Sequence, residues 1–205
     1  MNDITSAMAN HHAKIFSDYG PTARGVDWRD ELTANTRYEK MLAVVDDLYV
    51  GDSLLDVGCG YGGLLQYIHD NHYSISYRGI DVVPEMVQYA KSRFSPEQFE
   101  CSDVMRLDEN VRFDYVVCNG ILTQKLDISL LQMDVFAKAL IKKMFSLCNK
   151  GIAFNVMTTY VNFFAPNLFY KHPAELMIFC FSDVTHSLRM DHSYGLYEYT
   201  FYLFR

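Results

Sequence analysis

The chain has 205 residues, of which half are hydrophobic and 15% are aromatic, and its formal net charge is −7. This apolar content is enough for one well-buried core and excludes a disordered chain, and the length predicts a single domain, 1–205. An acidic chain without a Lys/Arg run lacks the charge that binds nucleic acid or an anionic membrane, so neither is expected as a partner. A small molecule is the expected partner.

The five cysteines, at positions 59, 101, 118, 148 and 180, are far apart and form no C-x-x-C pair. This spacing argues against a disulfide framework or a zinc cluster, and no His/Asp/Glu spacing resembles a metal site, so no metal is expected. The first residues lack the basic flank and apolar core of a secretory signal, and no apolar run reaches a membrane-spanning length. These features together predict a cytoplasmic protein with reduced thiols.

In chain order, residues 1–35 are polar and mixed, and they predict one or two short helices and a loop that lie over the domain. Apolar residues at helical spacing predict an amphipathic helix from Asn35 to Tyr49. Beyond it, short apolar runs alternate with helical patterns, which predicts a parallel sheet covered on both faces. The expected strands are 53–57, 77–80, 99–101, 113–118 and 152–157, and the expected helices are 62–72, 84–94 and 129–148.

The end of the chain breaks this alternation. Thr185–Met190 and Tyr197–Phe204 are strand-like runs, and the connection between them is too short for a helical crossover. They predict an antiparallel hairpin. The expected fold is therefore an α/β sheet that finishes with a hairpin.

The stretch LLDVGCGYGG, residues 54–63, satisfies two ligand-binding templates. Glycines at 58, 60 and 63 fit the dinucleotide pattern G-x-G-x-x-G, and the run from Asp56 to Gly62 fits D-x-G-x-G-x-G. Both templates place the loop between a strand and a helix, where ligands bind in open α/β sheets. The carboxylate of Asp56 would repel a pyrophosphate on the helix N-terminus but attract an ammonium group. Asp56 therefore favours a zwitterionic adenosine-type cofactor over a dinucleotide.

Three further strand ends carry polar residues. Asp81 can accept hydrogen bonds from ribose hydroxyls, and Asp103 can accept from an adenine amino group, although a helix cap is the alternative for Asp103. Asn119 is followed by Gly120 in a small turn that leaves room for a reacting centre, or that merely ends the strand. The expected cofactor contacts are Asp56, Gly58, Cys59, Gly60, Asp81, Val82, Ser102, Asp103, Val104, Asn119 and Gly120.

Taken together, these pieces resemble the class I S-adenosylmethionine-dependent methyltransferases of the small-molecule type. The matching segments are 54–62, 79–81, 101–104, 113–120 and 150–155, and they occur in the family's order. The resemblance implies a Rossmann-like three-layer sandwich, with a mostly parallel seven-stranded sheet and the cofactor at the carboxyl edges of its first strands. It implies methyl transfer from S-adenosylmethionine to an oxygen or nitrogen atom of a small molecule, with S-adenosylhomocysteine as product.

The flanking segments are only loosely covered by this resemblance. Residues 1–50 would form a lid or cap, in which Trp28 shields the sulfonium and Arg24 or Arg37 reaches a carboxylate, with Tyr19 in the same segment. The alternative is that Trp28 packs against the domain and the arginines face solvent. The cofactor-binding core would cover residues 51–157. Residues 158–205 would form an aromatic substrate wall and the terminal hairpin. For the segment Asn162–His172, the alternative is a helix that packs on the core.

Catalytic residues are poorly specified, because methyl transfer from a sulfonium mainly requires alignment and exclusion of water. Tyr160, His172, His186 and His192 are candidate bases, but a lone histidine is more often structural. Asn119-Gly120-Ile121-Leu122 replaces the Asn/Asp-Pro-Pro-aromatic motif of base-modifying enzymes. A non-catalytic cofactor-binding regulatory module and an NAD-binding oxidoreductase are the alternative functions, and the oligomeric state is expected to be monomer or homodimer.

Overall fold

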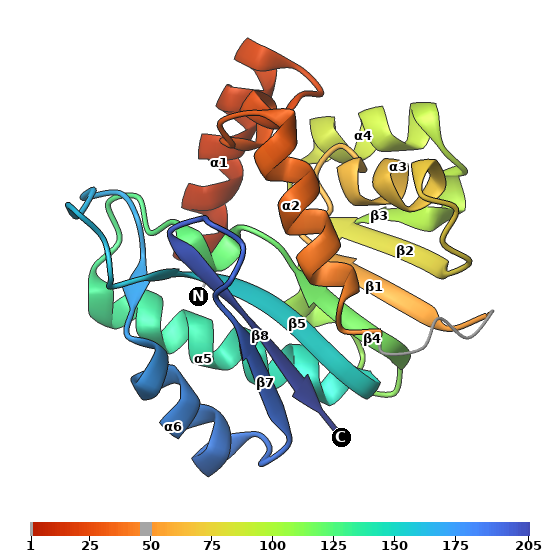
Figure 1. The fold of residues 1–205 in the computed structure, drawn as a ribbon. Coiled ribbons are helices and arrows are strands. Elements are labelled where there is room, and N and C mark those ends of the chain that lie inside the picture. Colours follow the sequence, from red (N-terminus) through yellow and green to blue (C-terminus); the bar gives the residue numbers. More distant parts are fainter. Residues whose placement is uncertain (1, 46–50) are drawn as a thin grey trace.

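A computed structural model describes residues 2–45 and 51–205. Its centre is a mixed sheet (Figure 1). The strand order is β3 (Phe99–Cys101), β2 (Ser76–Asp81), β1 (Ser53–Val57), β4 (Phe113–Cys118), β5 (Cys148–Thr158), β8 (Glu198–Phe204) and β7 (Leu188–Asp191), and the two-residue β6 (Tyr170–Lys171) pairs beside β5. The first five strands of this order are parallel, and β8 lies antiparallel to both β5 and β7.

Helices cover both faces of the sheet (Figure 1). The α-helices are α1 (Asn2–Tyr19), α2 (Glu31–Leu42), α3 (Gly63–Asp70), α4 (Pro84–Arg93), α5 (Leu130–Leu147) and α6 (Pro173–Asp183), and the short 3₁₀ helices are η1 (Ala23–Val26), η2 (Pro96–Gln98), η3 (Val104–Arg106) and η4 (Ile121–Thr123). Successive side chains of a strand point to opposite faces, so each strand supplies two cores. Leu54 packs with α2, α3 and α4, while its neighbour Leu55 packs with α5 and α6. The result is the expected three-layer sandwich.

Local signals account for several helix boundaries. Asp30 accepts a hydrogen bond from the Thr33 amide at 2.9 Å and thereby caps α2, and Ser129 forms a capping box with Gln132 at the start of α5. Pro84 opens α4, where its missing N–H costs no hydrogen bond. The Asp30 cap explains why α2 begins at Glu31, four residues before the start of the helix expected at Asn35. The expected end of that helix, Tyr49, lies outside the described residues.

The parallel sheet, its strand positions and the terminal antiparallel hairpin confirm the sequence-based predictions. The helices differ from the sequence-based predictions in two places. The N-terminal segment forms one 18-residue helix, α1, followed by η1, rather than one or two short helices. The helix α6 was not predicted; it follows the expected substrate-wall segment Asn162–His172, and Leu176, Phe179 and Cys180 bury one of its faces. Among the described residues, no helix has the length and apolar character needed to cross a membrane.

Candidate active site

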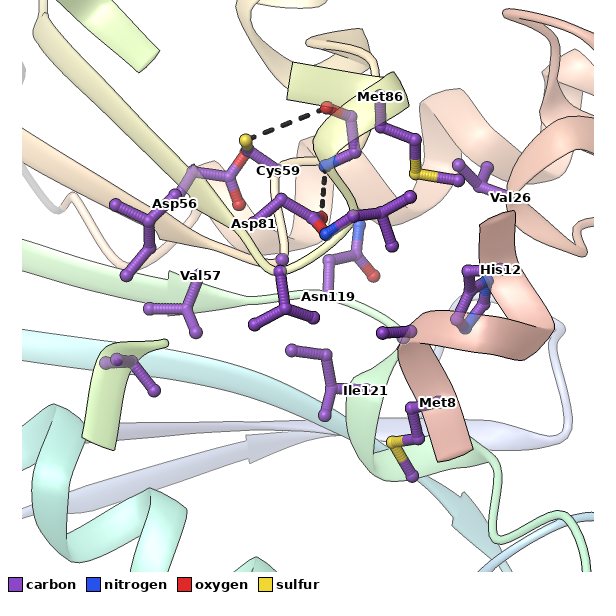
Figure 2. A pocket seen from close by; sticks show the side chains of 18 of the residues that line it. Met8, His12, Val26, Asp56, Val57, Cys59, Asp81, Met86, Asn119 and Ile121 are labelled. Carbon is purple, nitrogen blue, oxygen red and sulfur yellow. Dashed lines mark hydrogen bonds between the residues drawn. The ribbon is translucent and has the colours of Figure 1, made fainter. Parts of the chain in front are cut away.

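A cavity lies where the carboxyl ends of β1, β2 and β4 meet the helix α1 (Figure 2). The sheet contributes the segments Asp56–Gly60, Ile80–Val83, Ser102–Met105 and Asn119–Ile121, which are the strand ends expected from the sequence. The cavity and its open mouth together measure about 1150 Å³. Met8 and His12 reach toward it from α1, on the side opposite Asp56 and Cys59 (Figure 2).

The glycine loop adopts left-handed backbone conformations that residues with a Cβ rarely adopt. Gly58 and Gly60 have φ angles of +78° and +54°, in the left-handed region. A Cβ at Gly58 would also lie 2.7 Å from Cδ1 of Ile121. The absence of side chains therefore lets the loop pass close to the cavity.

Asp81, at the end of β2, holds the glycine loop in place through a hydrogen bond. Its Oδ2 accepts a hydrogen bond from the Gly60 amide at 2.8 Å, and its Oδ1 accepts one from the Val83 amide at 2.9 Å (Figure 2 marks the first). The side chain is buried, and this burial raises the pKa of Asp81 while the backbone hydrogen bonds oppose the rise. Each carboxylate oxygen keeps one lone pair, so Asp81 can still accept hydrogen bonds from hydroxyls in the cavity.

Asp56 is only 2% exposed and accepts a hydrogen bond from the Tyr77 hydroxyl at 2.7 Å. The pKa of Asp56 is raised to about 7, mainly by burial, with the charge of Asp81 contributing to the rise and the Tyr77 hydrogen bond opposing it. The carboxylate has no cationic partner among the described lining residues. A cationic ligand group would therefore be stabilised beside it.

Asn119 carries an amide whose oxygen and nitrogen are both buried without a hydrogen-bond partner among the described residues. The next residue, Gly120, donates its amide to Oδ1 of Asn155 at 2.8 Å, and its φ is +93°. Buried polar atoms are nearly always hydrogen-bonded in folded proteins. The Asn119 amide, which lines the cavity, is thus placed to bind a ligand.

The same cavity is also lined by Ser102, Asp103, Val104 and Val82. Oδ1 of Asp103 also accepts a hydrogen bond from the Met105 amide at 2.9 Å and so caps η3. The two interpretations weighed for Asp103 are therefore compatible, because a capping carboxylate retains capacity to accept another hydrogen bond.

The residues expected in the N-terminal lid divide into two groups. Trp28 lines the cavity and packs edge-on against Tyr38, so it is both a wall residue and a packing residue. The Arg37 guanidinium lies 5.1 Å from the centre of the Trp28 ring and pairs with Glu198, outside the lining. Arg24 and Tyr19 are exposed and do not line the cavity.

The candidate bases from the C-terminal part do not line the cavity either. The Tyr160 hydroxyl lies 3.0 Å from Nε2 of His172 on an exposed loop. His186 stacks on Phe181 before β7, and His192 packs edge-on against Tyr199 after it.

His12 is a cavity residue that the sequence analysis did not single out. The lining residues Thr5, Met8, Ala9 and His12 recur at helical spacing along one face of α1. That spacing was visible in the sequence, but the cavity it faces was not. Burial, the main cause, and the nearby His11 together lower the pKa of His12 to about 4 against the opposing effect of Asp27, so the imidazole is neutral near pH 7.

The charges that line the cavity distinguish a dinucleotide from a cofactor that carries an ammonium group. Its lining includes Asp56, Asp81 and Asp103 and, among the described residues, contains no Lys or Arg. A dinucleotide carries a pyrophosphate, which three carboxylates would repel. A cofactor with an ammonium and a sulfonium fits this set, and the largely apolar remainder of the lining suits an adenosine group. No cluster of three or more potential metal ligands occurs in the part of the chain that the structure describes.

Comparison with known proteins agrees with this geometry. Residues 54–151 match the family described as "Methyltransferase domain". A Mycobacterium tuberculosis protein described as a methyltransferase is 33% identical over 153 residues, which cover 72% of this chain and 90% of the relative. A malonyl-[acyl-carrier protein] O-methyltransferase of Acetivibrio thermocellus is 35% identical over 69 residues, which cover 33% of this chain and 24% of the relative.

The magnesium protoporphyrin IX methyltransferase of Synechocystis PCC 6803, solved with bound S-adenosylmethionine, superposes with a TM-score of 0.67 at 17% identity and covers 96% of each chain. The chain belongs to the class I S-adenosylmethionine-dependent methyltransferases. It is an S-adenosylmethionine-dependent methyltransferase of the Rossmann-like fold, as the sequence resemblance implied.

Proposed function

We propose that this methyltransferase acts on an oxygen or nitrogen atom of a small molecule. The observation that carries the proposal is that residues of the glycine loop and residues of α1 line the same cavity. The cofactor-side strand ends and the α1 side chains Met8 and His12 line one space, so donor and acceptor would meet inside it. A concave and largely apolar cavity of this kind suits a small molecule better than a polymer.

Each acidic residue has a distinct role in this proposal. Asp56 stabilises the ammonium of the cofactor, directly or through water, because it is buried without another cation. Asp81 accepts hydrogen bonds from the ribose hydroxyls while it holds the Gly60 amide. Asp103 accepts from the adenine amino group, and the backbone amide of Val104 faces a ring nitrogen.

S-adenosylmethionine supplies a methyl group that is already activated by its positive sulfur. The chain therefore has to align the acceptor and exclude water. Trp28, Met8 and Ile121 supply apolar walls for this purpose. The amide of Asn119 supplies hydrogen bonds that no described residue takes.

The test is calorimetric titration with S-adenosylhomocysteine, paired with a thermal-shift comparison against NADH. Binding of S-adenosylhomocysteine in the micromolar range and stabilisation by it alone are expected. A preference for NADH would replace the proposal with an oxidoreductase. Binding without label transfer to any component of a metabolite extract would instead support a regulatory binding module.

The oligomeric state, monomer or homodimer, remains a prediction from the sequence. Light scattering on the purified protein measures it directly. A larger assembly would contradict it.

A further inference from the structure

The helix α1 contributes no charged side chain to the described lining of the cavity. The α1 lining residues Thr5, Met8, Ala9 and His12 are uncharged near pH 7, and so are Thr123 and Gln124 at the end of η4. The carboxylates of the cavity belong instead to the strand ends that surround the glycine loop. A carboxylate or phosphate on the acceptor would find no Lys or Arg in the described lining, and an ammonium beside these uncharged residues would find no acid among them, so burial of either charge there would be unfavourable.

Asp27, an acid whose charge acts on His12, already has hydrogen-bond partners. Its Oδ2 accepts a hydrogen bond from Nε2 of Gln124 at 2.7 Å and lies 3.2 Å from Nε2 of His11. The amide of Gln124 is thereby fixed in orientation, and its Oε1 is buried with no hydrogen-bond partner in the described part of the chain. The cavity lining thus offers neutral hydrogen-bonding groups: Oε1 of Gln124, the amide of Asn119 and the imidazole of His12.

We infer that the methyl acceptor is an uncharged hydroxyl on a largely apolar molecule, and that His12 is the catalytic residue that takes its proton. This inference rests on the proposed methyl transfer. A hydroxyl requires a base because it must lose its proton when the oxygen attacks, whereas an amine attacks through a free lone pair. The imidazole of His12 is the titratable side chain that α1 directs into the cavity, and it is half-buried.

The acceptor oxygen forms a bond to the methyl carbon, the carbon–sulfur bond breaks, and its electron pair stays on sulfur. The O–H bond breaks and the proton moves to the unprotonated imidazole nitrogen of His12. Positive charge leaves the sulfur as the imidazole gains it, so the charge of the cavity is conserved. This conservation offsets the low proton affinity that burial gives His12.

The first arm of the test classifies the product. The protein is incubated with methyl-labelled S-adenosylmethionine and a metabolite extract, and the labelled products are treated with mild alkali before mass spectrometry. Methyl ethers survive alkali, whereas methyl esters release methanol. Label in a base-stable methyl ether is expected. Label mainly in esters or in N-methyl groups overturns the inference, and parallel binding of S-adenosylhomocysteine shows that the proposed cofactor site is intact in that case.

The second arm uses variants on the labelled acceptor fraction in single turnovers. His12→Gln keeps a hydrogen-bonding side chain but cannot take the proton, and it should slow transfer by about 100-fold or more without weaker S-adenosylhomocysteine binding. His12→Ala should regain rate when imidazole is added. His69→Gln, an exposed histidine on α3 outside the cavity, is the matched control. Unchanged transfer by folded His12→Gln, or no rescue of folded His12→Ala by imidazole, overturns the role of His12.

Discussion

The guanidinium of Arg37 and the carboxylate of Glu198 form a two-contact ion pair, with Nε to Oε1 at 2.9 Å and Nη2 to Oε2 at 3.2 Å. Their side chains are 15% and 1% exposed. The pair joins α2 to the start of β8 across 161 positions of sequence, and Arg37 also lies over Trp28. The Arg37 guanidinium, which was one of two expected to reach a ligand carboxylate, thus pairs with Glu198 of the chain itself. There it supports Trp28, a residue of the cavity wall.

Replacing Glu198 with Gln should lower the free energy of unfolding by about 3 kcal/mol, because loss of one partner leaves the other charge buried and unpaired. Urea denaturation measures this. Lys142 and Asp183 form an exposed pair, with side chains 50% and 43% exposed. Asp183→Asn is therefore the control and should change stability by less than about 1 kcal/mol. Equal effects of the two substitutions would contradict the structural role of the Arg37 pair.

Asp81→Asn should weaken binding of S-adenosylhomocysteine by about tenfold or more, because a hydrogen bond to a charged group contributes about 1.5–3 kcal/mol. The new amide nitrogen would also face the Gly60 or Val83 amide, which both donate to the present carboxylate. Calorimetry measures the affinity. Asp70→Asn, on the exposed end of α3, is the control. Retained affinity in Asp81→Asn would remove this residue from the cofactor site.

Asp56→Asn should change how stability depends on pH. The native pKa of Asp56 is raised to about 7 from 3.8, so between these values the native state holds a proton that the unfolded state has lost. The contribution of this residue to stability is therefore present below pH 4 and is lost as the pH rises through 7, by at most about 1.4 kcal/mol per pH unit. The Asn variant lacks this titration.

Unfolding of both proteins at pH 5 and pH 8 tests this expectation. The variant should gain stability relative to the parent as the pH rises, and it should bind S-adenosylhomocysteine more weakly at both values. The titration of His12 is present in both proteins and cancels in the difference. A pH-independent difference in stability would show that the Asp56 carboxyl is not shifted.

Gly63→Ala should destabilise the protein although alanine favours helices, because its Cβ would lie 2.1 Å from the Tyr38 hydroxyl oxygen and 3.0 Å from Cζ. Overpacking of this kind costs about 1–3 kcal/mol. In a Tyr38→Phe background the hydroxyl is gone, so the same substitution should cost less. The double-mutant cycle measured by urea denaturation gives the coupling. Additive effects would mean that the clash is relieved by other movement.

Most of the sheet could be predicted from the sequence because strand and helix periodicities are local. Phe99–Cys101 and Phe113–Cys118 occupy the positions that their apolar runs predicted, and the short final connection required a hairpin. The 11-residue helix α6 was not predicted, because apolar and aromatic residues dominate its sequence. Periodicity identifies a helix reliably only when one of its faces is clearly polar.

The sequence predicted the cavity residues that follow the strands but not those that α1 contributes. The glycine loop, Asp81 and Asn119 follow strands in sequence, and parallel strands bring their carboxyl ends to one edge. The placement of His12 and the exposure of Arg24 could not be predicted in the same way. Both belong to a segment that docks on the sheet from outside its alternating pattern.

The sequence by itself determined the layered α/β fold and the acid beside a glycine loop, because backbone permissiveness and side-chain charge are properties of adjacent residues. Only the tertiary structure decided which face of α1 closes the cavity and that Arg37 pairs with Glu198. These contacts join residues far apart in the chain, and they form where packing of the whole domain buries complementary surfaces. The chemistry of the donor side is thus encoded locally, whereas the surroundings of the acceptor depend on how the N-terminal helix docks.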